Sequence, residues 1–289
     1  MSYDLSCCFR NGDKNKYRIL WEITDMCNQR CPFCHAKGTN NITIEDVKKI
    51  LDNLKILQIK DIILTGGEPF LRKDIFEIMD MIQRGGYCVD LCTNGTLLDK
   101  EKISNLKKYV SEISVSLDAH NRELYRVLRG RDDFDKVIQN IRELVFQGIA
   151  VHLICTLNSH NYPFVEQIIA LAEELRVDSI AVANIIADIA NDVDYVKSVL
   201  LTDAQCKDIM LLIERLRPVT GIIINTKNIR KVCDNKQCMA GKNILGITSD
   251  GYLISCIMRR NSRKIKITGK IDAQMLHDLT ADYMESFQK

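Results

Sequence analysis

The sequence predicts an α/β fold: a partial (β/α)6 barrel followed by a smaller α+β module. Two observations predict the barrel. Six short runs rich in Ile, Val and Leu recur along residues 17–186, and an amphipathic helical pattern follows each of the first five. The chain has 289 residues, close to the limit of about 250–300 residues for one growing core, so an appended module is expected.

The expected strands are mostly apolar on both faces, as buried parallel strands are. They are YRILWEIT (17–24), DIILTG (61–66), YCVDLCT (87–93), EISVSLD (112–118), AVHLICTL (150–157) and SIAVANII (179–186). Helices are expected over 43–57, 74–85, 99–109, 133–148 and 162–177. Thr43 and Asp74 are the expected N-caps of the first two, and Gly85 ends the second. In such folds chemistry gathers at the carboxyl ends of the strands.

Four segments are expected along the chain. They are an N-terminal extension (1–16), the partial barrel (17–186), a connecting helix and strand (187–225) and a C-terminal module (226–289). In this module the apolar runs ILGIT and YLISC flank Asp250–Gly251, a pair typical of a hairpin turn. A helix from Thr202 to about residue 217 precedes the module and is stopped by Pro218.

Composition excludes several classes of function. Forty basic and 38 acidic side chains give a formal net charge of +2, which favours neither a nucleic-acid partner nor an acidic surface. The sequence contains neither a secretory h-region nor the ~20-residue apolar run of a membrane span. Twelve cysteines in a reducing compartment indicate metal binding or redox chemistry, with disulfides the weakest interpretation. We therefore expect a cytoplasmic protein without a membrane partner.

The segment CNQRCPFC (27–34) has three cysteines in eight positions. A thioredoxin-type site would need a helix after the CxxC pair, but HAKGTNN continues poorly as a helix and Cys27 would be idle. Zinc would have to recruit His35, although structural zinc usually uses two separated ligand pairs. Three thiolates without a fourth partner suit an iron–sulfur cluster with one iron open to another ligand.

The CxxxCxxC motif has Phe33 before its last cysteine, and GGEP (66–69) follows the next expected strand. Together these motifs resemble the radical S-adenosylmethionine (radical SAM) superfamily over residues 17–186. The resemblance implies a partial TIM-like barrel. It also implies that Cys27, Cys31 and Cys34 hold a [4Fe-4S] cluster whose open iron chelates S-adenosylmethionine.

The resemblance further implies a set of cofactor-binding residues at the carboxyl ends of the strands. They are Phe33, Gly66, Gly67, Glu68, Pro69, Asn94, Ser116, Asp118 and Arg129. The GGE residues are expected at the methionine ammonium and Phe33 at the adenine. Ser116 and Asp118 fall where polar groups reach ribose or substrate, and Arg129 is the expected partner of the methionine carboxylate. A simple turn role for Asn94, and a solvated helix position for Arg129, are the alternatives.

A second cysteine group, Cys233, Cys238 and Cys256, flanks the expected hairpin. It is similar to the auxiliary-cluster region of SPASM and twitch domains, which implies an auxiliary [4Fe-4S] cluster. The alternative is a structural zinc site. No cysteine follows Cys256, so the module resembles the short twitch form. Its fourth ligand position is either open, bound by substrate or filled by another side chain, for which Cys7, Cys8 and Cys206 are the candidates.

The resemblance implies reductive cleavage of S-adenosylmethionine and hydrogen abstraction by a 5′-deoxyadenosyl radical, with an external electron donor of the flavodoxin or ferredoxin type. The first hypothesis for the substrate is a ribosomally made peptide that is cross-linked, given a thioether or epimerised. The second is a small molecule (a sugar, cyclitol or nucleotide) that is oxidised or rearranged. A zinc-held binding scaffold is the non-enzyme alternative. Since the 16-residue extension is too short for a winged-helix domain, a peptide-recognition protein would be a separate chain.

Overall fold

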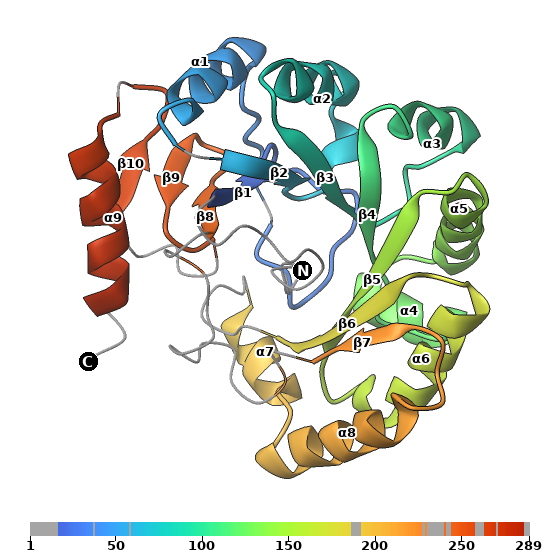
Figure 1. The fold of residues 1–289 in the computed structure, drawn as a ribbon. Helices are drawn as coiled ribbons and strands as arrows, with labels where there is room; N and C mark the ends of the chain where they lie inside the picture. Colours follow the sequence, from blue (N-terminus) through green and yellow to red (C-terminus); the bar gives the residue numbers. More distant parts are fainter. Residues whose placement is uncertain are drawn as a thin grey trace. The chain divides into compact units, whose positions relative to one another are not determined.

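The computed structural model describes residues 17–36, 38–57, 59–185, 192–226, 229, 240, 244–257, 263–269 and 271–285. Strands and helices alternate along most of this length (Figure 1). The described residues divide into two compact units. Unit 1 takes them from Gln29–His35 and Cys92–Cys233, and unit 2 takes them from Arg10–Asn28, Ala36–Leu91 and Asp234–Lys289.

Unit 2 is built on strands from distant parts of the chain. They are β1 (Tyr17–Glu22), β2 (Ile59–Thr65), most of β3 (Cys88–Thr93), β8 (Ile244–Ile247), β9 (Tyr252–Ile254) and β10 (Lys264–Lys266). Their order is β10-β9-β8-β1-β2-β3. Strand β1 pairs in parallel with both β2 and β8, and β9 runs antiparallel to β8 and β10. Helices α1 (Ile44–Leu54), α2 (Ile75–Arg84) and α9 (Ala273–Glu285) complete the unit, with the 3-10 turn η1 (Pro69–Leu71).

Unit 1 has four parallel strands in the order β4 (Val110–Ser116), β5 (Ala150–Leu157), β6 (Ser179–Asn184) and β7 (Ile223–Asn225). Its helices are α3 (Lys100–Leu106), α4 (Arg122–Arg129), α5 (Phe134–Phe146), α6 (Val165–Glu174), α7 (Val193–Val199) and α8 (Asp203–Leu216), with the 3-10 turn η2 (Tyr162–Phe164). A capping box at Thr202 starts α8.

The six predicted barrel strands and the five predicted helices between them are confirmed. Thr43 caps α1 through Asp46 N at 3.1 Å, as expected. Asp74 occupies the N-cap position of α2, but its carboxylate pairs with the Arg72 guanidinium at 2.7 Å and caps nothing. Arg72 in turn donates to the carbonyls of Ile23 and Ile42, so the first turn of α2 is tied to the chain around the end of β1.

Three described helices were not predicted, namely α4, α7 and α9. Helix α4 is short and rich in charge, which hides its apolar positions Tyr125 and Leu128. Its ends carry clear signals all the same: Asn121 caps Leu124 N at 2.9 Å, and Gly130 ends the helix in the left-handed region. This helix carries Arg129.

The predicted hairpin is confirmed as β8 and β9. Gly251 has φ +78°, and Thr248 N donates to Tyr252 O at 2.9 Å. The sequence did not predict where the hairpin pairs: Arg18 of β1 lies opposite Ile244 of β8 in a parallel register. Among the described residues, no helix has the length and apolar character needed to cross a bilayer.

A buried amide on α5 provides a test of packing in unit 1. Asn140 Nδ2 donates to Gly95 O at 2.8 Å and Leu98 O at 3.1 Å, in the segment after β3. Asn140→Ala leaves these carbonyls without that donor, so the free energy of unfolding should fall by about 1–3 kcal/mol in urea denaturation. Exposed Gln139 on the same helix is the control, and Gln139→Ala should change it by less than about 0.5 kcal/mol. Equal values for the two variants would contradict the packing role of Asn140.

Candidate functional site

The GGEP turn at the end of β2 is locked to the chain that follows β1. Gly67 N donates to Thr24 O and Glu68 N to Met26 O, both at 2.8 Å. A Cβ on Gly66, which has φ +143°, would lie 2.0 Å from Thr24 O, and a Cβ on Gly67 would lie 2.0 Å from Met26 O. Both positions therefore require glycine. The turn and the residues leading to Cys27 form one backbone frame within unit 2.

Glu68 and Pro69 continue this turn into η1. Glu68 is fully buried, and its carboxylate accepts from Phe70 N at 3.1 Å. Pro69 is the first residue of η1, where its fixed φ suits the turn and its missing N–H leaves no donor unsatisfied. The carboxylate thus has a fixed position at the carboxyl end of β2.

Residues 25–40, which we call the cluster loop, are closed at their base by Asp25. Its carboxylate accepts from Asn40 N at 2.6 Å, Asn40 Nδ2 at 2.9 Å and Ser249 Oγ at 3.3 Å. Asp25 N donates back to Asn40 O at 3.2 Å. The carboxylate lies so close to Gly38 that a Cβ there would be 1.9 Å from Asp25 Oδ2. One side chain therefore joins both ends of the loop and the β8–β9 turn.

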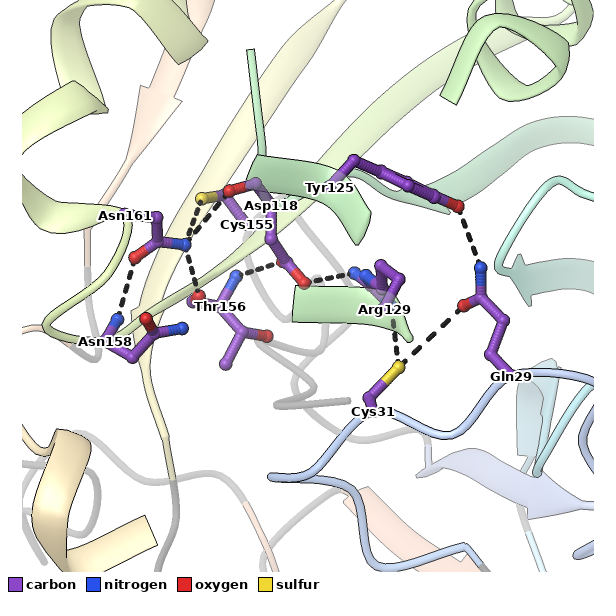
Figure 2. A network of polar contacts seen from close by, with 9 residues as sticks. All are labelled: Gln29, Cys31, Asp118, Tyr125, Arg129, Cys155, Thr156, Asn158 and Asn161. Carbon is purple, nitrogen blue, oxygen red and sulfur yellow. Dashed lines mark hydrogen bonds and ion pairs between the residues drawn. The ribbon is translucent and has the colours of Figure 1, made fainter. Parts of the chain in front are cut away.

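In unit 1, Cys31 lies in a polar network that Figure 2 shows. Cys34 N donates to Cys31 O at 3.0 Å, forming a turn between the two cysteines. The Cys31 thiol faces Gln29 Oε1 at 3.9 Å, and Gln29 Nε2 donates to Tyr125 OH at 2.8 Å. Burial raises the pKa of Cys31, and the positive charge of Arg129 opposes this rise. Without a bound cation this sulfur is a thiol at neutral pH.

Arg129 forms a buried ion pair with Asp118. Arg129 Nη2 and Asp118 Oδ2 are 2.5 Å apart, and their side chains are 2% and 0% exposed. Arg129 Nη1 donates to Cys31 Sγ at 3.8 Å, and the guanidinium carbon lies 6.0 Å from the centre of the Phe33 ring. Burial alone would lower the pKa of Arg129, but the charges of Asp118 and Cys31 outweigh it and raise the pKa. The guanidinium is therefore permanently charged.

Asn161 fixes the ends of β4 and β5 around this pair (Figure 2). Its Nδ2 donates to Thr156 O at 2.8 Å and Asp118 O at 3.1 Å, and its Oδ1 accepts from Asn158 N at 2.8 Å. Thr156 N donates to Asp118 Oδ1 at 2.7 Å. Each carboxylate oxygen of Asp118 is thus engaged inside the protein, one by a backbone N–H and the other by Arg129.

The remaining predicted residues divide between the units. Ser116 ends β4 and is buried, and buried Asn94 accepts from Thr96 N at 2.9 Å in a side-chain turn after β3. Cys27 and Cys256 belong to unit 2, whereas Cys31 and Cys34 belong to unit 1. Cys233 and Cys238 lie outside the described residues. Within the described part of the chain, no three or more His, Cys, Asp or Glu side chains are grouped closely enough to hold a metal ion.

The donors that are described fit an iron–sulfur cluster and a zwitterionic ligand. None of the eight described cysteines is in a disulfide. A thiol loses its proton when it binds a metal ion, and the positive charge of Arg129 favours the thiolate that Cys31 would then carry. Soft thiolates select iron–sulfur clusters or zinc. The buried Glu68 carboxylate and the buried Arg129 guanidinium have the charges that an ammonium and a carboxylate would require.

Sequence reasoning missed Asp25, Asn161 and Tyr125. Asp25 could have been found from its place two residues before Cys27, together with the Gly38–Asn40 segment that follows the motif. Asn161 is the last residue of the segment TLNSHN (156–161), which carries no sign that this side chain bonds two strand ends. Tyr125 has an ordinary helical spacing to Arg129, four residues later.

Residues 21–175 match the family model described as the Radical SAM superfamily. The chain is 30% identical to a probable GTP 3′,8-cyclase of Saccharolobus islandicus, over 83% of this chain and 82% of that protein. It is 31% identical to the Fe-coproporphyrin III synthase of Methanosarcina barkeri, over 56% of this chain and 42% of that one.

Two solved structures share the fold. Streptococcus suis SuiB bound to S-adenosylmethionine has a TM-score of 0.75 at 17% identity, over 93% of this chain and 68% of SuiB. Native anSMEcpe with bound AdoMet has a TM-score of 0.73 at 16% identity, over 92% of this chain and 81% of that one. The predicted fold, a partial barrel with a C-terminal hairpin module, is confirmed.

The three hydrogen bonds to the Asp25 carboxylate, which we call the Asp25 clasp, should protect the cluster loop from proteolysis. Asp25→Ala removes an acceptor of three hydrogen bonds, and a charged hydrogen bond contributes about 1.5–3 kcal/mol, so the loop should open at least about tenfold more often. Trypsin cleavage after Arg30, followed by mass spectrometry, should accelerate accordingly. The control is Asn41→Ala, which removes one contact of an exposed side chain to Met26 Sδ and should leave the rate nearly unchanged. Equal cleavage of the two variants would contradict the clasp.

Proposed function

The chain belongs to the radical SAM superfamily, and from this premise we propose that it cleaves S-adenosylmethionine reductively at a [4Fe-4S] cluster and uses the 5′-deoxyadenosyl radical to take a hydrogen atom from its substrate. The observation that carries the proposal is the GGEP turn, whose backbone is locked to the chain that leads into the CxxxCxxC motif. Positioning by rigid backbone is what a cofactor-dependent enzyme must supply.

We assign the three thiolates of Cys27, Cys31 and Cys34 to the cluster. Gly66, Gly67 and Glu68 hold the methionine ammonium, with Pro69 fixing their turn. Support for this assignment is the full burial of the Glu68 carboxylate, since a buried carboxylate favours a cationic partner.

Other residues complete the proposed cofactor site. Arg129 pairs with the methionine carboxylate, Phe33 packs against the adenine, and Ser116, Asp118 and Asn94 are the polar groups near ribose or substrate. Support comes from Arg129 being buried and charged, not solvated. Reduction of the cluster requires an external donor of the flavodoxin or ferredoxin type.

We further propose that Cys233, Cys238 and Cys256 hold an auxiliary [4Fe-4S] cluster. Cys256 follows β9, next to the end of the hairpin, as expected for a short twitch-like module. Such a cluster either accepts an electron from a substrate radical or orients the substrate.

For the substrate, we propose a small polar molecule and take GTP as the first compound to test. Support comes from curated relatives at 30% identity over most of both chains, which are named as probable GTP 3′,8-cyclases. Peptide maturation is the second candidate. It is favoured by the likeness in fold to SuiB, which was solved with its precursor peptide, but 18% identity supports the fold alone.

One assay distinguishes the two candidate substrate classes. Reconstituted protein with dithionite and S-adenosylmethionine should form more 5′-deoxyadenosine with GTP than with ATP, and mass spectrometry should find a modified guanine nucleotide. Candidate precursor peptides from neighbouring small reading frames, with or without a separate recognition protein, form the other arm. Stimulation by such a peptide and not by GTP would reverse the ranking.

Iron content tests both cluster assignments. Anaerobic reconstitution should give about eight irons per chain, falling to about four in a Cys27→Ala/Cys31→Ala/Cys34→Ala variant that no longer cleaves S-adenosylmethionine. Cys233→Ala/Cys238→Ala/Cys256→Ala should also retain about four, but keep S-adenosylmethionine cleavage. About four irons falling to none in the first variant would reject the auxiliary cluster. If the wild-type protein is colourless and contains zinc, only the hypothesis of a zinc-held binding scaffold would remain.

A further inference from the structure

Arg129 has two polar partners in unit 1, and one is a cysteine sulfur. Its Nη2 pairs with Asp118 at 2.5 Å, and its Nη1 donates to Cys31 Sγ at 3.8 Å. Its Nε is buried without a hydrogen-bond partner. The side chain is 2% exposed, so solvent does not screen its charge.

We propose that Arg129 sets the reduction potential of the cluster through the Cys31 thiolate, and that Asp118 is a positioning residue that aims the guanidinium and offsets its charge. The inference rests on the proposed role of Cys31 as a cluster ligand. It assigns Arg129 a function before S-adenosylmethionine binds, separate from the proposed contact with the methionine carboxylate.

The sign of the effect follows from electrostatics. One electron from the external donor reduces the cluster and adds one negative charge to it, with no bond made or broken. A nearby cation and an N–H donor to a ligand sulfur stabilise this more negative state, so Arg129 raises the potential. The carboxylate of Asp118 acts in the opposite direction. Both charges are in a buried environment, where their effects are larger than in water.

The position of Arg129 is held from several sides. Tyr125 lies one helical turn earlier on α4, and its hydroxyl accepts from Gln29, whose Oε1 faces Cys31 Sγ. Asp118 is held by Thr156 N, and its carbonyl is held by Asn161 (Figure 2). The guanidinium therefore cannot turn away from Cys31 without breaking the Asp118 pair.

The test is an EPR-monitored potentiometric titration of reconstituted protein with dithionite, without S-adenosylmethionine. The Cys233→Ala/Cys238→Ala/Cys256→Ala background leaves the N-terminal cluster as the reporter. Arg129→Gln should lower the potential by at least the 59 mV that corresponds to a tenfold change in the ratio of reduced to oxidised cluster for one electron. Asp118→Asn should raise the potential. The double variant should lie below the parent, by less than Arg129→Gln alone.

Arg126→Gln is the matched control, because Arg126 is an exposed arginine on the same helix. It should leave the potential unchanged. Removing one partner of a buried pair destabilises a protein, because it leaves a buried charge without its counter-charge. If one of the single variants, Arg129→Gln or Asp118→Asn, loses its cluster, the potential can still be measured in the other one. The double variant, which removes both charges, provides a further measurement.

Each outcome has one meaning. An unchanged potential in Arg129→Gln, with weaker S-adenosylmethionine binding, would overturn the inference and leave Arg129 as a carboxylate partner only. Shifts of the same sign in Arg129→Gln and Asp118→Asn would also overturn it, since a purely structural ion pair disturbs the cluster alike from either side. A parent protein without any [4Fe-4S] signal would contradict the proposed function instead.

Discussion

The close approach of Gly66 and Gly67 to the backbone of Thr24 and Met26 is the constraint on which the site in unit 2 depends. The two segments share hydrogen bonds at 2.8 Å, and no side chain fits between them. Because backbone atoms form this contact, no side-chain conformational entropy is lost when it forms. Cys27, the first cysteine of the motif, directly follows Met26. Its backbone position is therefore set by the contact between the ends of β1 and β2.

In unit 1 the polar network around Cys31 depends on an ion pair between Asp118 and Arg129. Here two opposite charges are buried, and hydrogen bonds to the remaining polar atoms offset part of the cost of burying such a pair. Thr156 N engages one oxygen of Asp118, and Asn161 fixes the backbone that carries it. The strand ends therefore define a charge arrangement, whereas the GGEP turn defines a backbone shape. In the proposed function, the backbone shape orients the cofactor and the charge arrangement acts on the cluster.

Much of this was predictable from sequence because the signals are local. Apolar runs predicted the barrel strands, and Asp250–Gly251 predicted the hairpin. The CxxxCxxC and GGEP motifs indicated the proposed ligands. The pairing of Asp118 with Arg129 was not predictable, because nothing in either segment indicates its partner. Asp25 and Ser249 are 224 residues apart, and their contact depends on the parallel pairing of β8 with β1, which local patterns do not encode.

That pairing has a consequence for how the chain folds during synthesis. Strand β1 leaves the ribosome well before its neighbour β8, which begins only at Ile244. Until then one edge of β1 offers unpaired N–H and C=O groups, which are a template for wrong pairing with other chains. Most of unit 1 is a continuous segment, Cys92–Cys233, and is complete before β8 is made. The nascent chain thus carries an open strand edge on β1 until β8 is made, and chaperones that cover such edges would protect it from wrong association.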